Sequence, residues 1–264
     1  MLIPIDHPDD NRIAHYKDFR ERDLVRNKRQ FIAEGTTVIQ ALQSQNRFKL
    51  RSLLILENRL DGISHIISSC DDDMPIYVVA KPIMDQIAGF DMHRGVLGLA
   101  DAPKDIDEPP VFQPQCKRIV VLVGLSNHDN VGSIFRNCAA FGVDAVLMDS
   151  QTCDPLYRKA IRVSVGGVFK IPFFRFETMA DILTLLENNN FKTIALSPTG
   201  AMDMADWTPP DKAALVLGTE GQGLPPTLLS SMTSVRIDMS DDFDSLNVAT
   251  TSGIVLHHLF KNQR

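Results

Sequence analysis

A continuous run of apolar, mostly β-branched residues at positions 117–125 (KRIVVLVGL) constrains the fold more than any other segment of the sequence. Such a run is typical of a strand buried on both faces, and strands of that kind occur in parallel sheets covered by helices. A polar loop follows it, then a helical pattern over residues 131–141 that ends at Gly142, and a second apolar strand over residues 144–149. Together these segments predict a βαβ unit with a right-handed crossover.

The rest of the C-terminal half continues this alternation. Apolar strands are expected at residues 193–197, 213–218 and 235–239, and helices at residues 181–189 and 248–261. The pattern predicts an α/β domain with a mostly parallel sheet. Ligands bind such sheets beyond the carboxyl ends of their strands, so the loops that leave the strands are candidates for a functional site.

The first polar loop, residues 126–136 (SNHDNVGSIFR), leaves the first buried strand. Asn130 is expected to cap the following helix, and Gly132 allows a ligand to approach the backbone closely. Arg136 lies further into that helix, from where its guanidinium can reach back to the mouth of the loop. By itself, however, Arg136 also fits a plain surface arginine on an amphipathic helix.

The second loop, residues 217–225 (LGTEGQGLP), places three glycines around Glu220. Its G-x-x-G-x-G spacing differs from the dinucleotide-binding fingerprint, and no G-K-[ST] of a phosphate-binding loop is present. The glycines indicate a backbone that wraps a ligand and holds one carboxylate near it. A glycine-rich turn before a helix is the alternative.

The third loop, residues 244–251 (DSLNVATT), precedes a helix that begins with small side chains. Ser245 and Asn247 are good capping residues for that helix. Its small residues allow close packing against another backbone. A plain N-cap on a buried helix is the alternative.

In this order, N-x-x-N-V-G-S-I-x-R-N, L-V-L-G-T-E-G-x-G-L and S-L-N-V-A closely resemble the three motifs of the SpoU/TrmH family of RNA ribose 2′-O-methyltransferases. Phe31, Glu34, Gly35 and residues 93–96 (HRGV) resemble the small RNA-binding domain, similar to ribosomal protein L30, that precedes many members. The resemblance implies a trefoil-knotted α/β domain of the SPOUT superfamily that forms a homodimer. It also implies S-adenosylmethionine as cofactor and structured RNA as substrate, with rRNA favoured over tRNA.

The same resemblance assigns the site residues. Those implied around the cofactor are Gly218, Glu220, Gly223, Ile237, Ser245, Leu246 and Asn247. Those implied in catalysis are Arg136, Glu220, Asn247 and Asn130. Two roles are open for Arg136, a general base or a clamp on the adjacent phosphate and the developing alkoxide; the clamp is preferred because a guanidinium has a pKa above about 12. Ala249 stands where the family usually has serine and Asp238 where it often has proline, and both are expected to alter cofactor affinity.

Acids and prolines over residues 101–116 predict a linker between a small α/β RNA-binding domain (1–100) and a methyltransferase domain (117–264). The elements expected in the small domain are strands and one helix, at residues 51–56, 75–80, 93–100 and 36–43.

The net charge of −6 does not itself indicate a nucleic-acid-binding protein, but basic residues cluster between Arg12 and Arg29 and again after Tyr157. A local basic patch on an acidic protein still binds phosphates. The residues expected to contact RNA are Arg20, Arg22, Arg26, Lys28, Arg29, Arg158 and Arg162. A solvated helix with internal ion pairs, such as Asp18 with Arg22, is the alternative for the first cluster.

The four cysteines are scattered without a C-x-x-C pair, which predicts neither a metal site nor disulfides. No signal peptide and no apolar stretch of membrane-spanning length are recognised, so a cytoplasmic protein is expected. Two other functions fit the same sheet: a non-catalytic RNA-binding ribosome-assembly factor and a small-molecule nucleotide-binding enzyme. Intact Arg136, Glu220 and Asn247 argue against the first, and a separate basic N-terminal domain argues against the second.

Overall fold

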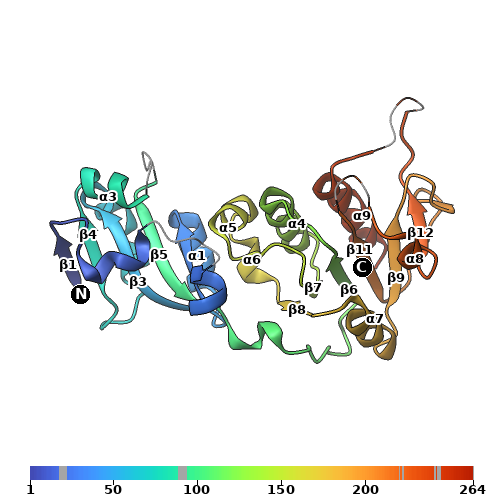
Figure 1. The fold of residues 1–264 in the computed structure, drawn as a ribbon, viewed down its shortest axis with the longest axis horizontal. Helices are drawn as coiled ribbons and strands as arrows, with labels where there is room; N and C mark the ends of the chain where they lie inside the picture. Colours follow the sequence, from blue (N-terminus) through green and yellow to red (C-terminus); the bar gives the residue numbers. More distant parts are fainter. Residues whose placement is uncertain are drawn as a thin grey trace. The chain divides into compact units, whose positions relative to one another are not determined.

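The computed structural model describes residues 1–17, 23–88, 94–219, 221, 223–240, 242 and 245–263. The chain forms two compact units (Figure 1). The first contains residues 1–103 and 154–170, and the second contains residues 104–153 and 171–264. Residues 154–170, which the sequence assigns to one contiguous C-terminal domain, therefore pack with the N-terminal unit.

The first unit is built on a five-stranded mixed sheet in the order β1-β4-β3-β5-β2. Strands β1 (Leu2–Ile5), β4 (Ile76–Val79) and β3 (Lys49–Leu56) run parallel to one another. Strand β5 (Val96–Asp101) lies antiparallel between β3 and β2 (Gln30–Glu34). The sheet thus combines a parallel half with an antiparallel half.

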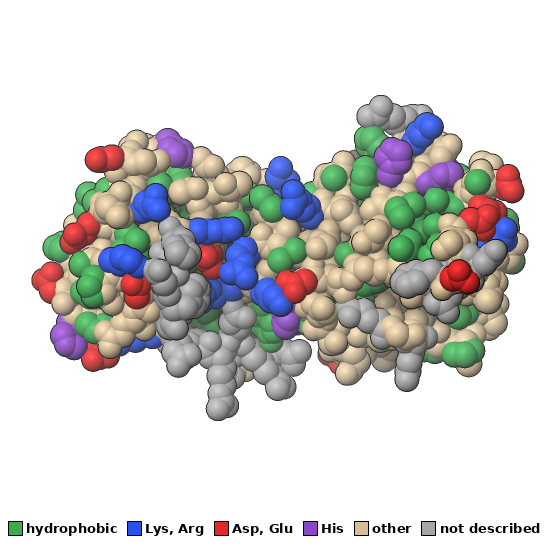
Figure 2. Space-filling model, turned by 90° about the horizontal axis from the view of Figure 1, so that it is seen from above, with side chains coloured by type: hydrophobic (Ala, Val, Ile, Leu, Met, Phe, Trp, Pro, Cys, Tyr) green, Lys and Arg blue, Asp and Glu red, His purple; other side chains and the backbone are tan. Residues whose placement is uncertain are grey.

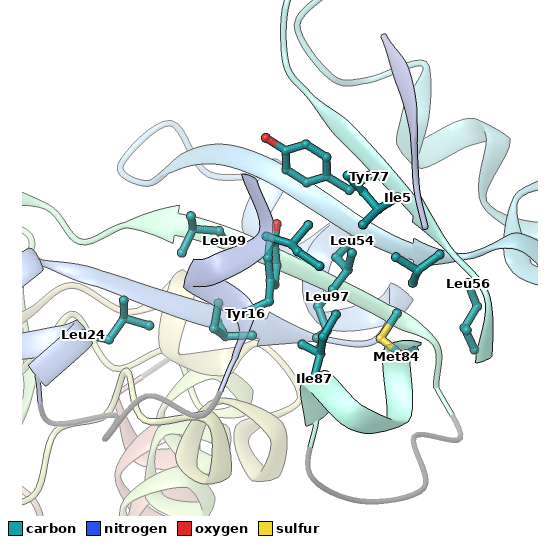
Figure 3. Close-up of a cluster of buried hydrophobic side chains, with 13 residues drawn as sticks. Ile5, Tyr16, Leu24, Leu54, Leu56, Tyr77, Met84, Ile87, Leu97 and Leu99 are labelled. Carbon is teal, nitrogen blue, oxygen red and sulfur yellow. The ribbon is translucent and has the colours of Figure 1, made fainter. Parts of the chain in front are cut away.

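A cluster of buried apolar side chains joins strands β1, β3, β4 and β5 to the flanking helical segments (Figure 3). It includes Tyr16 from the 3-10 helix η1 (Asn11–Tyr16) and Met84 from α3 (Lys81–Ala88). The hydroxyl of Tyr16 forms a 2.6 Å hydrogen bond with the hydroxyl of Ser52, so the polar end of this buried ring is satisfied.

Helix α1 (Thr36–Gln43) spans the range that the sequence predicts. Helices α5 (Arg158–Ser164) and α6 (Gly167–Lys170) join the same unit from much later in the chain. The ring of Phe169 stacks on Phe31 of β2 with centroids 5.6 Å apart and meets Phe48 at 5.0 Å. This aromatic contact explains why residues 154–170 pack with the first unit.

The second unit contains a seven-stranded sheet in which every described pair of neighbouring strands is parallel. Its strands, in spatial order, are β10 (Met202–Asp203), β12 (Thr233–Arg236), β9 (Lys192–Leu196), β11 (Ala213–Leu217), β6 (Arg118–Leu122), β7 (Ala145–Met148) and β8 (Phe173–Arg175). The predicted α/β fold with a parallel sheet is confirmed. Strands β7, β9 and β11 lie within one residue of their predicted bounds, whereas β6 ends three residues early.

The predicted βαβ unit is formed by β6, α4 (His128–Ala140) and β7. As expected, Gly142 follows the end of α4 with φ +60°, which L side chains rarely adopt. The expectation that Asn130 caps α4 is wrong. Asn127 is the cap, since its side chain accepts a 2.8 Å bond from the amide of Asp129, and Asn130 lies within the helix.

Three further helices complete the second unit: α7 (Met179–Asn188), α8 (Pro226–Leu229) and α9 (Val248–Asn262). Helix α9 packs against α4. A Cβ atom added at Gly253 would lie 3.2 Å from the side-chain nitrogen of Asn137. The small residues at the start of α9 therefore serve the close packing that the sequence predicts.

Part of the acidic, proline-containing segment expected as a linker is held on the second unit. The 3-10 helix η5 (Lys104–Asp107) lies beside β8, and its Ile106 is buried. Further on, the ring of Phe112 meets Phe191 with centroids 5.3 Å apart.

Candidate functional site

A cavity of about 830 Å³ lies in the second unit beyond the carboxyl ends of β9, β11 and β12. These three strands are neighbours in the sheet, as Figure 1 shows, so the loops that follow them meet at one edge. Six of the seven residues predicted to bind a cofactor line this cavity: Gly218, Gly223, Ile237, Ser245, Leu246 and Asn247. The seventh, Glu220, lies outside the described residues.

The loop after β11 closes into a tight turn. The amide of Gly223 donates to the carbonyl oxygen of Thr219 at 3.0 Å, and the hydroxyl of Thr219 donates to the carbonyl oxygen of Gly223 at 3.1 Å. A Cβ atom at Gly218 would lie 2.6 Å from the carbonyl carbon of Gly223 and 2.7 Å from the amide nitrogen of Leu224. Only glycine fits at position 218 without moving backbone, so this turn is a rigid rim of the cavity.

Apolar side chains also line the cavity. They include Leu246, which is 41% exposed, Ile237 and Met239. The expected strand over residues 235–239 is shifted relative to β12 (Thr233–Arg236), which begins two residues earlier and ends three residues earlier. β12 ends at Arg236 because its partner β10 ends at Asp203, which leaves Ile237 in the loop that faces the cavity.

The side chains of Asn130 and Asn247 connect the first and third loops. Nδ2 of Asn247 donates to Oδ1 of Asn130 at 2.9 Å, and Asn130 is only 6% exposed. Oδ1 of Asn247 accepts from the amides of Ala249 and Thr250 at 2.9 and 3.3 Å, so Asn247 is also the N-cap of α9, as predicted. Both ends of this amide are bonded, which fits a residue that positions two loops rather than one that reacts.

Asn137 adds a second connection, which joins helix α4 to helix α9. Its Nδ2 donates to the carbonyl oxygen of Ala249 at 2.8 Å and to the hydroxyl oxygen of Ser252 at 2.9 Å, and Ser252 is fully buried. Sequence reasoning gave Asn137 no role, although it is the last asparagine of the first motif. Its place in that motif was the sequence feature that could have identified it as a site residue.

Asp149, directly after β7, organises the loop after β6. Its carboxylate accepts the amide of Gly124 at 3.0 Å and the amide and hydroxyl of Thr152 at 2.8 and 2.7 Å. A Cβ atom at Gly124 would lie 2.8 Å from Cγ2 of Thr219, which lines the cavity. Sequence reasoning missed Asp149; an aspartate at the carboxyl end of a predicted parallel strand was the signal.

Arg136 is exposed on α4 and does not line the cavity. Its guanidinium forms no ion pair with any residue that the structure describes, so it is available to an anionic ligand.

The basic residues predicted to contact RNA are only partly described. Arg20 and Arg22, with the expected pair of Arg22 and Asp18, lie outside the described residues, as does the side chain of Arg26. Lys28 and Arg29 are exposed residues next to β2.

Arg158 and Arg162 lie on α5, where both face the carboxylate of Glu34 at 3.5 and 4.0 Å. The Glu34 side chain is only 8% exposed, so this pairing is largely withdrawn from solvent. Part of the charge of these two arginines is therefore used within the first unit.

Within the described ranges, no group of three or more histidine, cysteine or acidic side chains is arranged to hold a metal ion. In the same part of the chain, no helix combines the length and apolarity needed to cross a bilayer.

Comparison with known proteins shows the family of this chain. Residues 117–257 match the model of the SpoU rRNA methylase family. An uncharacterized tRNA/rRNA methyltransferase of Mycobacterium bovis is 34% identical over 261 residues, which cover 95% of this chain and 88% of the relative. The chain belongs to the SpoU rRNA methylase family, as its three motifs predict.

Solved structures share the fold over nearly the whole chain. The SpoU methyltransferase AviRb of Streptomyces viridochromogenes, in complex with the cofactor AdoMet, is 19% identical with a TM-score of 0.82 and covers 96% of this chain and 98% of its own. An RNA 2′-O ribose methyltransferase is 24% identical with a TM-score of 0.80 and covers 100% of this chain and 99% of its own. Both units therefore have the architecture of these proteins.

Proposed function

We propose that this protein transfers a methyl group from S-adenosylmethionine to a ribose 2′-hydroxyl of structured RNA, and that rRNA is its substrate rather than tRNA. The observation that carries the proposal is the cavity beyond β9, β11 and β12, where the second and third family motifs meet. The family name and the name of the RNA 2′-O ribose methyltransferase with the same fold support the choice of acceptor.

The cavity suits S-adenosylmethionine in size and in lining. Its volume of about 830 Å³ falls in the usual range of small-molecule sites. The exposed Leu246 and the half-buried Ile237 offer apolar surface to an adenosine, and the backbone around Gly218 and Gly223 offers hydrogen bonds to polar groups. When bound there, S-adenosylmethionine supplies a methyl group on an electrophilic sulfonium.

Arg136 is proposed to act on the RNA side of the reaction. A ribose hydroxyl is a poor nucleophile that loses its proton near the transition state. A guanidinium resists deprotonation, so Arg136 binds the neighbouring phosphate and stabilises the developing alkoxide. Its exposure on α4 leaves it accessible to a macromolecular substrate.

Asn130 and Asn247 are proposed to position the reacting parts. Their 2.9 Å hydrogen bond joins the helix that bears Arg136 to the loop that bears Ser245 and Leu246. The acceptor oxygen must lie in line with the transferred methyl group, and such positioning supplies much of the acceleration. Glu220 is assigned to the same site by its motif alone.

The remaining family features are part of the proposal: a trefoil knot in the second unit, a homodimer and a cytoplasmic location. Four free cysteines fit a reducing compartment. Light scattering of the purified protein tests the dimer, and a mass equal to one chain would contradict it.

The reaction is tested with S-adenosylmethionine tritiated on its methyl group and deproteinised total RNA. Label is expected in RNA, and after alkaline hydrolysis it should remain in dinucleotides, because a methylated 2′-oxygen cannot attack the adjacent phosphate. Label in mononucleotides would overturn the ribose assignment. RNA binding without label would favour the assembly factor.

A further inference from the structure

A second cavity, of about 580 Å³, lies within the first unit and is lined by three arginines. They are Arg59, Arg94 and Arg162, and all three are exposed. No described residue that lines the cavity is acidic. Of these arginines, only Arg162 was among the residues that the sequence predicts to contact RNA.

The chain brings Arg94 beside the start of α1 through a backbone contact. The amide of Gly35 donates to the carbonyl oxygen of Val96 at 2.9 Å. A Cβ atom at Gly35 would lie 3.0 Å from Cδ of Arg94, and the φ of +93° also requires glycine at this position. Gly35 and Arg94, about sixty residues apart in the sequence, thus lie next to each other in the lining of the cavity.

A neighbouring contact places Arg59. The amide of Leu56, at the end of β3, donates to the carbonyl oxygen of Gly95 at 2.9 Å. A Cβ atom at Gly95 would lie 3.1 Å from Cγ of Arg59. The stem of Arg94 therefore lies against Gly35, and the stem of Arg59 lies against Gly95, the residue that follows Arg94.

The described lining of this cavity carries three arginines and no carboxylate. Glu34, a buried carboxylate of the same unit that lies outside this lining, faces both Arg158 and Arg162. Glu57 and Asp61, which flank Arg59, are exposed and do not line the cavity. The first amides of α1 receive no side-chain cap from Gly35, and they add partial positive charge.

We infer that this arginine cavity binds the phosphodiester backbone of the RNA substrate; the inference rests on RNA being the substrate of the proposed function. The planar guanidinium of arginine matches two phosphate oxygens, and several guanidiniums around one open cavity fit successive phosphates. Figure 2 shows lysine and arginine side chains gathered on one face, in the part of the molecule that holds α1 and α5. Phosphate contacts of this kind position a nucleic acid without reading its sequence.

The test compares RNA binding by the wild type, the double variant Arg59→Ala/Arg94→Ala and the matched control Arg51→Ala. Arg51 is an exposed arginine of the same unit whose guanidinium pairs with Asp101 outside the cavity. Filter binding uses tRNA and rRNA fragments transcribed in vitro, at several salt concentrations. The double variant should bind on the order of tenfold more weakly or worse, and the slope of log K against log salt should fall by about 0.7 for each phosphate that the variant no longer binds.

The variant Arg94→Lys distinguishes a loss of charge from a loss of folding as the cause of weaker RNA binding. It keeps the charge and should retain part of the RNA affinity. Equal affinity and equal salt slope in the wild type and the double variant would overturn the inference. So would an equal loss in Arg51→Ala. If the wild type binds RNA through these arginines but transfers no methyl group to it, the proposed reaction fails while the RNA-binding site stands.

Discussion

The two cavities of this protein differ in the residues that line them. The cavity beyond β9, β11 and β12 is lined by glycine backbone, apolar side chains and uncharged polar side chains, with no charged residue among its described lining. The cavity at the start of α1 is lined by three arginines and is comparable in size. A site of the first kind selects a small ligand by shape and backbone hydrogen bonds, whereas a site of the second kind binds a polyanion by charge.

This difference separates the two tasks of an RNA methyltransferase. In the proposed function, binding of the cofactor depends on a rigid turn, where one added carbon atom would meet backbone at 2.6 Å. Binding of RNA at the arginine cavity would depend on long, exposed side chains that tolerate small displacements. Changes in one cavity are therefore expected to leave ligand affinity at the other unchanged, and Arg136, which lines neither, should affect the reaction itself.

The largest effect is expected for Arg136→Lys. The change keeps the positive charge but removes the planar donor pair, so the rate with both ligands saturating should fall by about 100-fold or more. The affinity for S-adenosylmethionine should stay within about twofold, because Arg136 does not line the cofactor cavity. Tritium transfer to RNA gives the rate and isothermal titration gives the affinity. Loss of cofactor binding in this variant would refute the proposed role of Arg136 as a clamp on the phosphate and the developing alkoxide.

The next largest effect is expected from salt, which should weaken RNA binding much more than cofactor binding. If three phosphates are bound at the arginine cavity, raising the salt from about 50 to 200 mM should weaken RNA binding roughly twentyfold, for a slope of about 0.7 per phosphate. Cofactor binding, which involves no described charged side chain, should change by less than about twofold. Filter binding and isothermal titration over the same salt series check both values. A cofactor affinity that falls with salt as steeply as the RNA affinity would show that the two cavities do not differ in how strongly charge contributes to binding.

The lining of the proposed cofactor cavity was largely predictable because its residues follow strands of a parallel sheet. Residues within each loop are close in sequence, and the carboxyl ends of parallel strands meet at one edge, so Gly218, Ile237 and Asn247 converge. Small errors came from local competition between similar residues. Asn127 and Asn130 are both good caps; Asn127 caps α4 through the amide of Asp129, whereas Asn130 lies within the helix and bonds Asn247.

The arginine cavity was not predictable in this way. Arg59, Arg94 and Arg162 come from separate segments, and backbone contacts at Gly35 and Gly95 bring the first two together. Position along the sequence carries no signal for such long-range contacts. The same holds for residues 154–170, whose place in the first unit depends on the contact of Phe169 with Phe31 and Phe48.

A smaller effect is expected for Gly218→Ala. The added carbon overlaps the backbone of Gly223 and Leu224, so the turn must shift, and the affinity for S-adenosylmethionine should fall at least about tenfold. RNA affinity should be unchanged. The control for cofactor affinity is Gly62→Ala, in the first unit, at a glycine with no atom within 4 Å of the added carbon. Isothermal titration in which the two variants bind the cofactor equally well would show that the turn is not a rigid rim.

The smallest effect is expected in the stability of the second unit, for Asn247→Ala. The change removes the cap of α9 and leaves Oδ1 of the buried Asn130 without this donor, at a cost of about 1–3 kcal/mol in the free energy of unfolding. The single tryptophan reports on this unit, because Trp207 is buried and stacks on His258 of α9 with centroids 5.7 Å apart. Urea unfolding followed by its fluorescence measures the change.

Asn262→Ala, at the exposed end of the same helix, is the control for this prediction and should cost less than about 0.5 kcal/mol. Asn247→Asp separates the two contributions of Asn247. It keeps an oxygen for the amides of Ala249 and Thr250 but faces Asn130 with a second acceptor, so it should preserve the cap and still lower stability. An Asp variant as stable as the wild type would mean that the two loops are joined by Asn137 and packing, since Asn137 bonds both Ala249 and Ser252 independently of Asn130.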